Sequence, residues 1–300
     1  GSVMRNTLPM SDIRTLASQI PFWIQVTRLD RPAGWIVLLW PTWIALTLAG
    51  FKADTFDLGI WVIFTLGVIF TRSAGCVVND LTDRKFDKHV KRTRFRPITS
   101  GNLSIKTAVI LAIVLFLVCF GLVLMTNRET IKLSFVAFGF AIIYPWLKRV
   151  TFWPQIGLGL AFSMAIPMAF AAYEQPLDQI VWALFLGNVS WTLAYDTFYA
   201  MVDRDDDLRI GVKSTAIAFG RCDLVAIGCC QLIAVAGFSH SFWLAQLNSM
   251  VIFGIVGAIG FALHHQHIAR TRSRDACFRA FIENHRLGAA LFFGTVLGSL

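Results

Sequence analysis

The chain has 300 residues, of which 56% are hydrophobic and 15% charged, and its mean hydropathy is +0.63. These values lie outside the usual range for a soluble domain and indicate several membrane-spanning segments surrounded by lipid. The formal net charge of +9 is carried by basic residues between apolar stretches, so it predicts membrane topology and argues against nucleic acid as a partner.

The chain begins with the residues GSV before Met4, which have the composition of an expression scar, so residues 1–3 are set aside. The region up to Pro21 lacks the apolar core of a cleavable signal peptide. No change in composition divides the chain after Pro21. We therefore expect residues 1–300 to form a single transmembrane domain.

Nine apolar stretches are each long enough to cross a bilayer if some tilt is allowed. They are expected to be helices, because a backbone in lipid must satisfy its own hydrogen bonds. The expected segments are 33–50, 58–80, 105–125, 131–147, 155–173, 178–200, 223–241, 247–267 and 284–300. The fold class is therefore an all-α membrane protein with nine transmembrane helices, and Pro41, Pro145, Pro154 and Pro167 are expected sites of kinks.

Basic residues are distributed unevenly between the loops. One side of the membrane would carry only Lys52, Arg128 and Lys132. The other would carry the basic residues of the N-terminal region and of four loops: Arg5, Arg14, Arg28 and Arg31, Arg84 to Arg96 with Lys106, Lys148 and Arg149, Arg204 to Arg221, and Arg270 to Arg286. The positive-inside rule then places the N-terminus and these loops in the cytoplasm and the C-terminus outside.

Two segments, one in each half of the chain, combine an acidic helix face with a basic loop. In NDLTDRKFD, Asn79, Asp83 and Asp87 are spaced i, i+4, i+8, with Asp80 beside them. This spacing puts the three oxygen-bearing side chains on one face of a helix. The second segment repeats the arrangement with Asp196, Tyr199, Asp203 and Asp207, which suggests a weak internal repeat.

Carboxylates this close together repel one another, and each costs on the order of 2.5–3.5 kcal/mol near the bilayer centre. A cation should compensate, and oxygen donors without a Cys or His cluster favour Mg²⁺, which proteins often hold together with substrate phosphates. The acidic faces therefore predict a phosphate-bearing substrate. The alternative is two solvated helix ends paired with Arg84, Lys85, Lys88 and Arg204, but the match between the two faces makes it the weaker interpretation.

Basic residues follow both acidic faces. Such cations help to bind a diphosphate and to stabilise it as a leaving group. The candidates are Lys91, Arg92, Arg94, Arg96, Lys148, Arg149, Arg209 and Lys213, each of which has a purely topological role as its alternative. Arg72 is different, because it lies inside the second segment, two helical turns deeper than Asn79. It predicts either a structural ion pair or a site for the carboxylate of a second substrate.

Several stretches along nearly the whole chain resemble those of a known family: RPAGWIVLLWPTWIAL, RSAGCVVNDLTDRKFDKHVKRT, RPITSG, YPWLKR, IPMAFAA, AYDTFYAMVDRDDDLRIGVKSTAI and ACFRAFIENH. They are similar to the UbiA superfamily of intramembrane aromatic prenyltransferases. The two motifs N-D-x-x-D-x-x-x-D and D-x-x-Y-x-x-x-D-x-x-x-D are highly specific in combination, and their acidic positions show no departure from the family's pattern.

The resemblance implies nine helices around a central cavity in a bacterial inner membrane, with the acidic motifs facing each other near the cytoplasm and a lateral opening for an isoprenoid tail. It also implies a reaction: an allylic polyprenyl diphosphate gives its prenyl group to 4-hydroxybenzoate, ortho to the hydroxyl, and releases diphosphate, in ubiquinone biosynthesis. Acceptors such as a dihydroxynaphthoate, homogentisate or haem remain alternatives. A secondary transporter is the alternative from another class.

The resemblance also assigns expected roles to residues, which fall into three groups. Asn79, Asp83, Asp87, Asp203 and Asp207 would hold Mg²⁺ and the diphosphate. Substrate would be bound by Arg72 and Arg149 at the carboxylate, by Lys91, Arg92 and Lys148 at the phosphates, and by Asp80 close by. The resemblance places Asp196 close by as well. Because the reaction also needs a base that removes the ring proton or polarises the phenol, we hypothesise that Asp196 beside Tyr199 has this role, which makes these two the expected catalytic residues.

Overall fold

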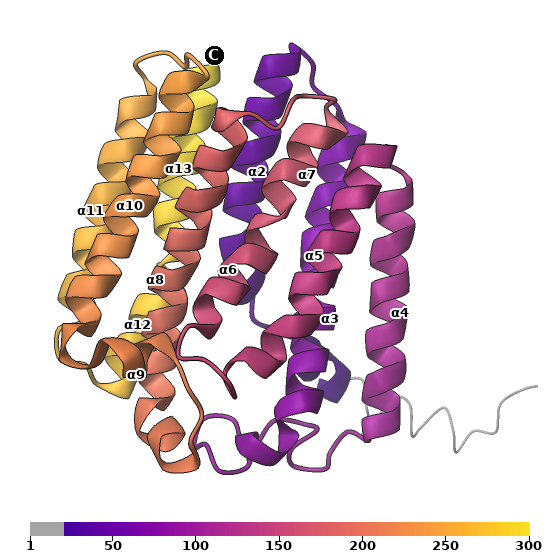
Figure 1. The fold of residues 1–300 in the computed structure, drawn as a ribbon, viewed down its shortest axis with the longest axis vertical. Helices are drawn as coiled ribbons and strands as arrows, with labels where there is room; N and C mark the ends of the chain where they lie inside the picture. The colour runs from indigo at the N-terminus through magenta and orange to yellow at the C-terminus, as the bar shows by residue number, and fades with distance from the viewer. Residues whose placement is uncertain (1–20) are drawn as a thin grey trace, which may run out of the picture.

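The computed structural model describes residues 21–300, which form a helical bundle without a β-strand (Figure 1). The expected scar at residues 1–3 and the basic residues Arg5 and Arg14 lie outside the described residues. Residues 21–27 are helical. The later elements are α2 (Ala33–Ala53), α3 (Leu58–Asp87), α4 (Ile105–Leu124), α5 (Arg128–Leu147), α6 (Pro154–Ser163), α7 (Ala165–Ala172), α8 (Gln179–Ile210), α9 (Thr215–Phe219), η1 (Gly220–Cys222), α10 (Asp223–Leu244), α11 (Val251–Ala269), α12 (Arg274–Glu283) and α13 (His285–Ser299).

Helix α8 is the central element of the bundle, and it packs against α6, α10 and α12. The main apolar core lies between α2, α7, α8, α10 and α13 and includes the fully buried Trp191 and Phe238. Helices α4 and α5 lie at the outer edge of the bundle (Figure 1), and their apolar side chains are mostly exposed. Such an apolar outer surface suits lipid contact.

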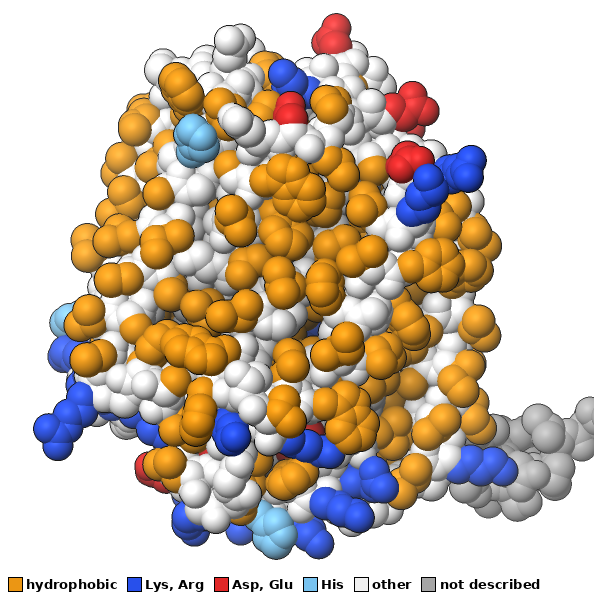
Figure 2. Space-filling view, viewed as in Figure 1, with side chains coloured by type: hydrophobic (Ala, Val, Ile, Leu, Met, Phe, Trp, Pro, Cys, Tyr) orange, Lys and Arg blue, Asp and Glu red, His pale blue; other side chains and the backbone are white. Residues whose placement is uncertain are grey.

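Within residues 21–300, seven helical segments are long and apolar enough to cross a membrane. Two expected segments do not meet this criterion: no stretch of α8 is apolar enough, and α13 has only 15 residues. The prediction of an all-α protein is confirmed in the described residues, whereas the prediction of nine crossings stays a prediction. Lys and Arg side chains gather at the lower end in Figure 2, where the loops before α4 and after α8 lie.

The two helices that carry the acidic motifs are longer than expected. Helix α3 continues to Asp87, and α8 continues to Ile210, where Gly211 ends it in the left-handed region at φ 76°. Asp80, Asp83 and Asp87 are buried on one side of α3, so these charges face the protein interior, and the helix ends only at the last of them. Both motifs therefore lie on regular helix, which fixes the direction of their side chains.

The observed helices differ from the expected segments in two other places, each for a local reason. The expected segment 155–173 is divided at Met164 into α6 and α7, because Pro167 has no N–H to donate to the carbonyl of Ser163. The stretch after α11 was expected to be a basic loop, but it contains α12. The N-cap residue Ser273 starts this helix by accepting a hydrogen bond from the amide of Ala276. Helix α12 packs on α8 and so borders the end of the second motif.

Candidate active site

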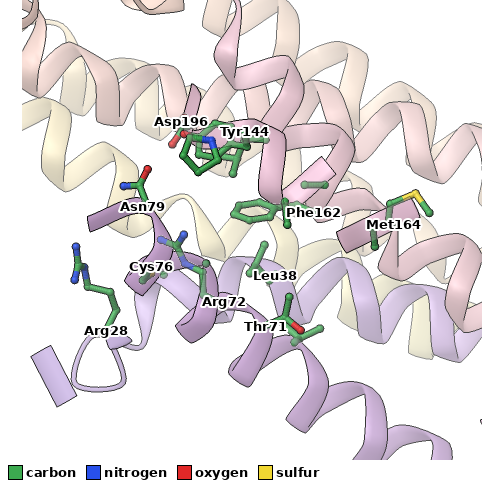
Figure 3. A pocket seen from close by; sticks show the side chains of 18 of the residues that line it. Arg28, Leu38, Thr71, Arg72, Cys76, Asn79, Tyr144, Phe162, Met164 and Asp196 are labelled. Carbon is green, nitrogen blue, oxygen red and sulfur yellow. The ribbon is translucent and has the colours of Figure 1, made fainter. Parts of the chain in front are cut away.

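A cavity of about 720 Å³ lies among α2, α3, α4, α5, α6 and α8, and the loop between α3 and α4 covers part of it. Its walls include the phenylalanines Phe116, Phe120, Phe135 and Phe138 of α4 and α5. Figure 3 shows Arg72 and Asn79 of α3 around this space together with Tyr144 and Asp196. The cavity thus combines a long apolar wall with a group of ionisable side chains.

Some members of the first acidic motif line this cavity and others do not. Asn79 and Asp87 line it, and Arg96 donates a hydrogen bond of 3.1 Å to Asp87 Oδ2. Asp83 is fully buried and does not line the cavity among the described residues. The ammonium of Lys148 binds Asp83 Oδ2, whereas Asp83 Oδ1 has no hydrogen-bond partner in the described part of the chain. The guanidinium of Arg149 lies 3.8 Å from Asp83 Oδ1, too far for a hydrogen bond, so this buried oxygen is a candidate ligand atom.

Asp80 lies beside the first motif but points elsewhere. Its carboxylate is fully buried and receives two hydrogen bonds of 2.9 Å from Arg28 and one of 3.1 Å from Arg96. Asp80 is not among the described residues that line the cavity, although both arginines are. Two guanidinium groups therefore occupy the oxygens of Asp80 in this structure, and the expected contact between Asp80 and substrate stays a prediction.

The second acidic motif lines the cavity with all four of its members, Asp196, Tyr199, Asp203 and Asp207. Arg92 pairs with Asp203 at 2.7 Å and donates a second hydrogen bond to the Tyr199 hydroxyl. The Tyr199 ring packs against that of Phe281 in a tilted arrangement, with 4.4 Å between ring centroids. Steps of three and four residues on one continuous helix account for the common orientation of the motif.

Two arginines of the loop between α3 and α4 remain cationic although they are largely buried. Burial alone would lower the pKa of Arg96, but the adjacent Asp80 and Asp87 raise that pKa above its ordinary value. For Arg92, burial is likewise outweighed by Tyr199 and Asp203, and the pKa is raised. Both side chains line the cavity, so two guanidinium groups lie at its polar end beside the carboxylates that pair with them.

Two other expected substrate contacts lie outside the cavity lining of the described chain. Lys91 is exposed and contributes its backbone amide, which binds Asp206. Arg149 lies over the rings of Phe86 and Trp146, at 4.8 Å and 4.6 Å from their centroids. Lys148 does line the cavity, whereas the expected contacts of Lys91 and Arg149 with substrate stay predictions.

Arg72 lies deeper on α3 and lines the cavity (Figure 3). Its guanidinium lies 5.7 Å from the ring centroid of Phe162, and its buried Nε has no hydrogen-bond partner among the described residues. Within residues 21–300 Arg72 forms no ion pair, which argues against the structural alternative considered for it. A buried cation with an unused donor is suited to bind an anionic ligand.

The structure also adds cavity residues that the motifs did not indicate. Arg28 lines the cavity, although its position before the first apolar segment suggested only a topological role. Tyr144 lines it from α5, beside Asp196 in Figure 3. Sequence spacing contains little signal for either residue, because each reaches the cavity only through the packing of separate helices. The YPWLKR stretch, which includes Tyr144, was the nearest indication.

The helical bundle has an apolar outer surface and a cavity lined by carboxylates, cations and phenylalanines, and such a cavity suits a ligand that is both anionic and apolar. The model of the UbiA prenyltransferase family matches residues 38–295. The chain is 49% identical to the 4-hydroxybenzoate octaprenyltransferase of Vibrio atlanticus, with 93% of this chain and 98% of the relative covered. The chain belongs to the UbiA prenyltransferase family, and the predicted resemblance is confirmed.

Solved structures of the family have the same fold. An apo UbiA homolog from Aeropyrum pernix K1 matches with a TM-score of 0.77 at 21% identity, covering 89% of this chain and 98% of that one. A UbiA homolog from Archaeoglobus fulgidus, bound to GPP and Mg²⁺, matches with a TM-score of 0.68 at 18% identity, covering 92% and 99%. With the seven apolar segments, family membership indicates an integral membrane protein.

Proposed function

We propose that this protein transfers a polyprenyl group from an allylic polyprenyl diphosphate to 4-hydroxybenzoate, at the carbon ortho to the hydroxyl, and releases diphosphate, as a step in ubiquinone biosynthesis. The observation that carries the proposal is a cavity lined by both acidic motifs, by cations and by a long apolar wall. Near-complete coverage of the Vibrio atlanticus 4-hydroxybenzoate octaprenyltransferase at 49% identity supports the choice of acceptor.

We also propose how the protein lies in a bacterial inner membrane. Helices α8 and α13 would cross together with the seven apolar segments, giving nine crossings, a cytoplasmic N-terminus and one domain over the whole chain. The basic loops around residues 88–104 and 211–222 would then face the cytoplasm, in agreement with the positive-inside rule. The polar end of the cavity would open on the same side.

The acidic residues suit Mg²⁺ in their chemistry, although among residues 21–300 no three His, Cys, Asp or Glu side chains are assembled into a metal site. Carboxylate and amide oxygens are the donors that this ion prefers, and Asp83 Oδ1, which accepts no hydrogen bond among the described residues, is one of them. We propose Asn79, Asp83, Asp87, Asp203 and Asp207 as the residues that would hold it. Bound there, Mg²⁺ would neutralise charge on the departing diphosphate.

The cations of the cavity have a second role in this proposal. Lys148, Arg96 and Arg92 each pair with a carboxylate of the proposed metal set, namely Asp83, Asp87 and Asp203. If those carboxylates held the metal, the three cations would be free to bind phosphate oxygens. They would then stabilise the leaving group, while the phenylalanine wall holds the prenyl chain and keeps water from the allylic cation.

Asp196 is the residue that we propose to accept the proton from the acceptor. It lines the cavity, while the hydroxyl of its motif neighbour Tyr199 already accepts a hydrogen bond from Arg92. Replacing Asp196 by Asn preserves the side-chain shape but removes the base, so we expect kcat to fall about 10²–10⁴-fold. The KM values of both substrates should change little in steady-state kinetics. A rate near that of the wild type would remove Asp196 from the mechanism.

Arg72 is proposed to bind the acceptor's carboxylate with its unused guanidinium donors. We expect Arg72→Ala to raise the KM for 4-hydroxybenzoate about tenfold or more, because a charge-assisted contact is lost, while the KM for the diphosphate donor stays the same. The uncharged acceptor analogue 4-hydroxybenzamide serves as the control substrate. It should be used equally by the wild type and the variant, whereas an equal loss with both acceptors would contradict carboxylate binding.

A competition assay tests the choice of acceptor. The purified protein would receive Mg²⁺, a prenyl diphosphate and an equimolar mixture of 4-hydroxybenzoate, 1,4-dihydroxy-2-naphthoate and homogentisate, with products identified by mass. We expect prenylated 4-hydroxybenzoate to predominate. Preference for another acceptor would keep the family assignment but overturn the proposed substrate, and the absence of any prenylated product would contradict the proposed function as a whole.

A further inference from the structure

Asp206 lies between Asp203 and Asp207 of the second acidic motif but is not a member of that motif. It is almost completely buried, at 2% exposure. The backbone amide of Lys91 donates a hydrogen bond of 3.0 Å to Asp206 Oδ2. Arg274 of α12 donates one of 3.2 Å to the same oxygen, and Arg209 pairs with Oδ1. The carboxylate therefore joins three separate parts of the chain.

The segment held by Asp206 is the loop between α3 and α4, where residues 88–104 form turns and bends and no helix or strand. The residue after Lys91 is Arg92, which reaches into the cavity to bind Asp203 and Tyr199. On the other side of Arg92, the Thr93 hydroxyl donates a hydrogen bond of 2.9 Å to the carbonyl of Asp87. Arg92 is thus held on both sides, by α8 and by the end of α3.

Arg274 connects this arrangement to α12. It is about one-third exposed, whereas Asp206 is buried, so the ion pair lies at the edge of the protein, and the same carboxylate also accepts the hydrogen bond from the Lys91 amide. Leaving a buried carboxylate without its partners costs folding free energy, so these contacts are expected to persist. A loop without regular structure has few other contacts that fix the position of its backbone. Asp206 is therefore well placed to determine where the backbone at Lys91, and with it the Arg92 guanidinium, lies.

We infer that Asp206 is a positioning residue: it fixes the loop at Lys91 and thereby presents Arg92 to the diphosphate end of the cavity. This inference rests on the proposed function in that the ligand of Arg92 is taken to be the donor's diphosphate. Asp206 itself does not contact substrate. Its loss should weaken diphosphate binding through Arg92 and leave the acceptor's site around Arg72 unaffected.

The first test compares Asp206→Ala with Asp205→Ala, because Asp205 is the exposed neighbour in the same acidic run. We expect Asp206→Ala to raise the KM for the prenyl diphosphate about tenfold, the effect of a lost charge-assisted contact. The KM for 4-hydroxybenzoate should change less than about twofold, and Asp205→Ala should resemble the wild type. A merely structural defect would instead lower kcat through the active fraction, leave both KM values unchanged and overturn the inference.

The second test asks whether the effect passes through Arg92. Binding of inorganic diphosphate with Mg²⁺ would be measured by calorimetry for the wild type, Asp206→Ala, Arg92→Ala and the double variant. Asp206→Ala should weaken binding about tenfold in the wild type but less than about twofold when Arg92 is absent. Equal weakening in both backgrounds would overturn the inference. If Asp206→Ala does not purify as a folded protein, Asp206→Asn replaces it in the same cycle, because it keeps the shape and one acceptor oxygen.

The two tests separate this inference from the proposed function. If the wild type forms no prenylated product, the proposed function fails, but the diphosphate binding cycle still decides whether Asp206 positions Arg92. If the wild type is active and Asp206→Ala keeps its affinity for diphosphate and its donor KM, the positioning role fails while the proposed function stands.

Discussion

Replacing Asp203 by alanine is expected to reduce prenyl transfer about 10³-fold. Asp203 lines the cavity and is proposed to hold Mg²⁺, whose Lewis acidity supplies several kcal/mol to a transition state that loses diphosphate, and each ~1.36 kcal/mol corresponds to a factor of ten. The variant also releases Arg92 from its 2.7 Å ion pair. The rate should be measured as product formation in a single turnover over a range of Mg²⁺ concentrations.

Arg92→Ala is the matched control, because it removes the cation and keeps the carboxylate. If Asp203 only anchored Arg92, the two variants would lose equal activity at every Mg²⁺ concentration. We expect the Asp203 variant to lose more, and to need more Mg²⁺ for half-maximal rate. Treatment of the wild type with EDTA should abolish turnover, and added Mg²⁺ should restore it. Full activity in EDTA would rule out the metal in this reaction.

The second large effect is expected on stability, from Asp80→Ala. Its carboxylate is fully buried between Arg28 and Arg96, and removing one partner of a buried ion pair costs about 3–5 kcal/mol. The two arginines keep some contact with solvent, so we expect about 3 kcal/mol. Thermal unfolding of the purified protein in detergent should show a lower midpoint than that of the wild type.

Arg28→Ala provides the comparison for Asp80. This variant leaves the Asp80 carboxylate paired with Arg96, so its unfolding midpoint should fall less than that of Asp80→Ala. The two measurements distinguish a structural role of Asp80 from a direct contact between Asp80 and substrate. An Asp80→Ala protein that unfolds like the wild type but has a much higher KM for substrate would restore the direct substrate contact expected from the sequence and contradict the structural role.

The acidic motifs were the part of the site most accessible from sequence. Their steps of three and four residues match the helical period, so the orientation of Asp196, Tyr199, Asp203 and Asp207 follows once α8 is a regular helix. Helix class and most segment positions follow from apolar length. The ends of α3 and α8 could not be predicted in this way, because hydropathy cannot distinguish a charge at the end of a helix from one that is paired inside the protein.

The pairing of the cations could not be derived from the sequence. Lys91 and Arg92 are neighbours with the same charge, yet one is exposed and the other lines the cavity. That difference arises from the course of a loop without secondary structure, held by Asp206 and Thr93. Asp80 follows Asn79 directly in the motif, but its ion pair with Arg28 joins residues far apart in sequence. Such contacts depend on tertiary packing, which periodicity does not describe.

The central claim is that the ring carbon ortho to the acceptor's hydroxyl is prenylated, and isotopic labelling tests it most directly. Purified protein with Mg²⁺ and a polyprenyl diphosphate would be given 4-hydroxybenzoate carrying deuterium at both positions ortho to the hydroxyl. We predict a prenylated product that has lost one of the two deuterium atoms, as seen by mass spectrometry. A product that keeps both, or no prenylated product with donors of any chain length, would contradict the claim.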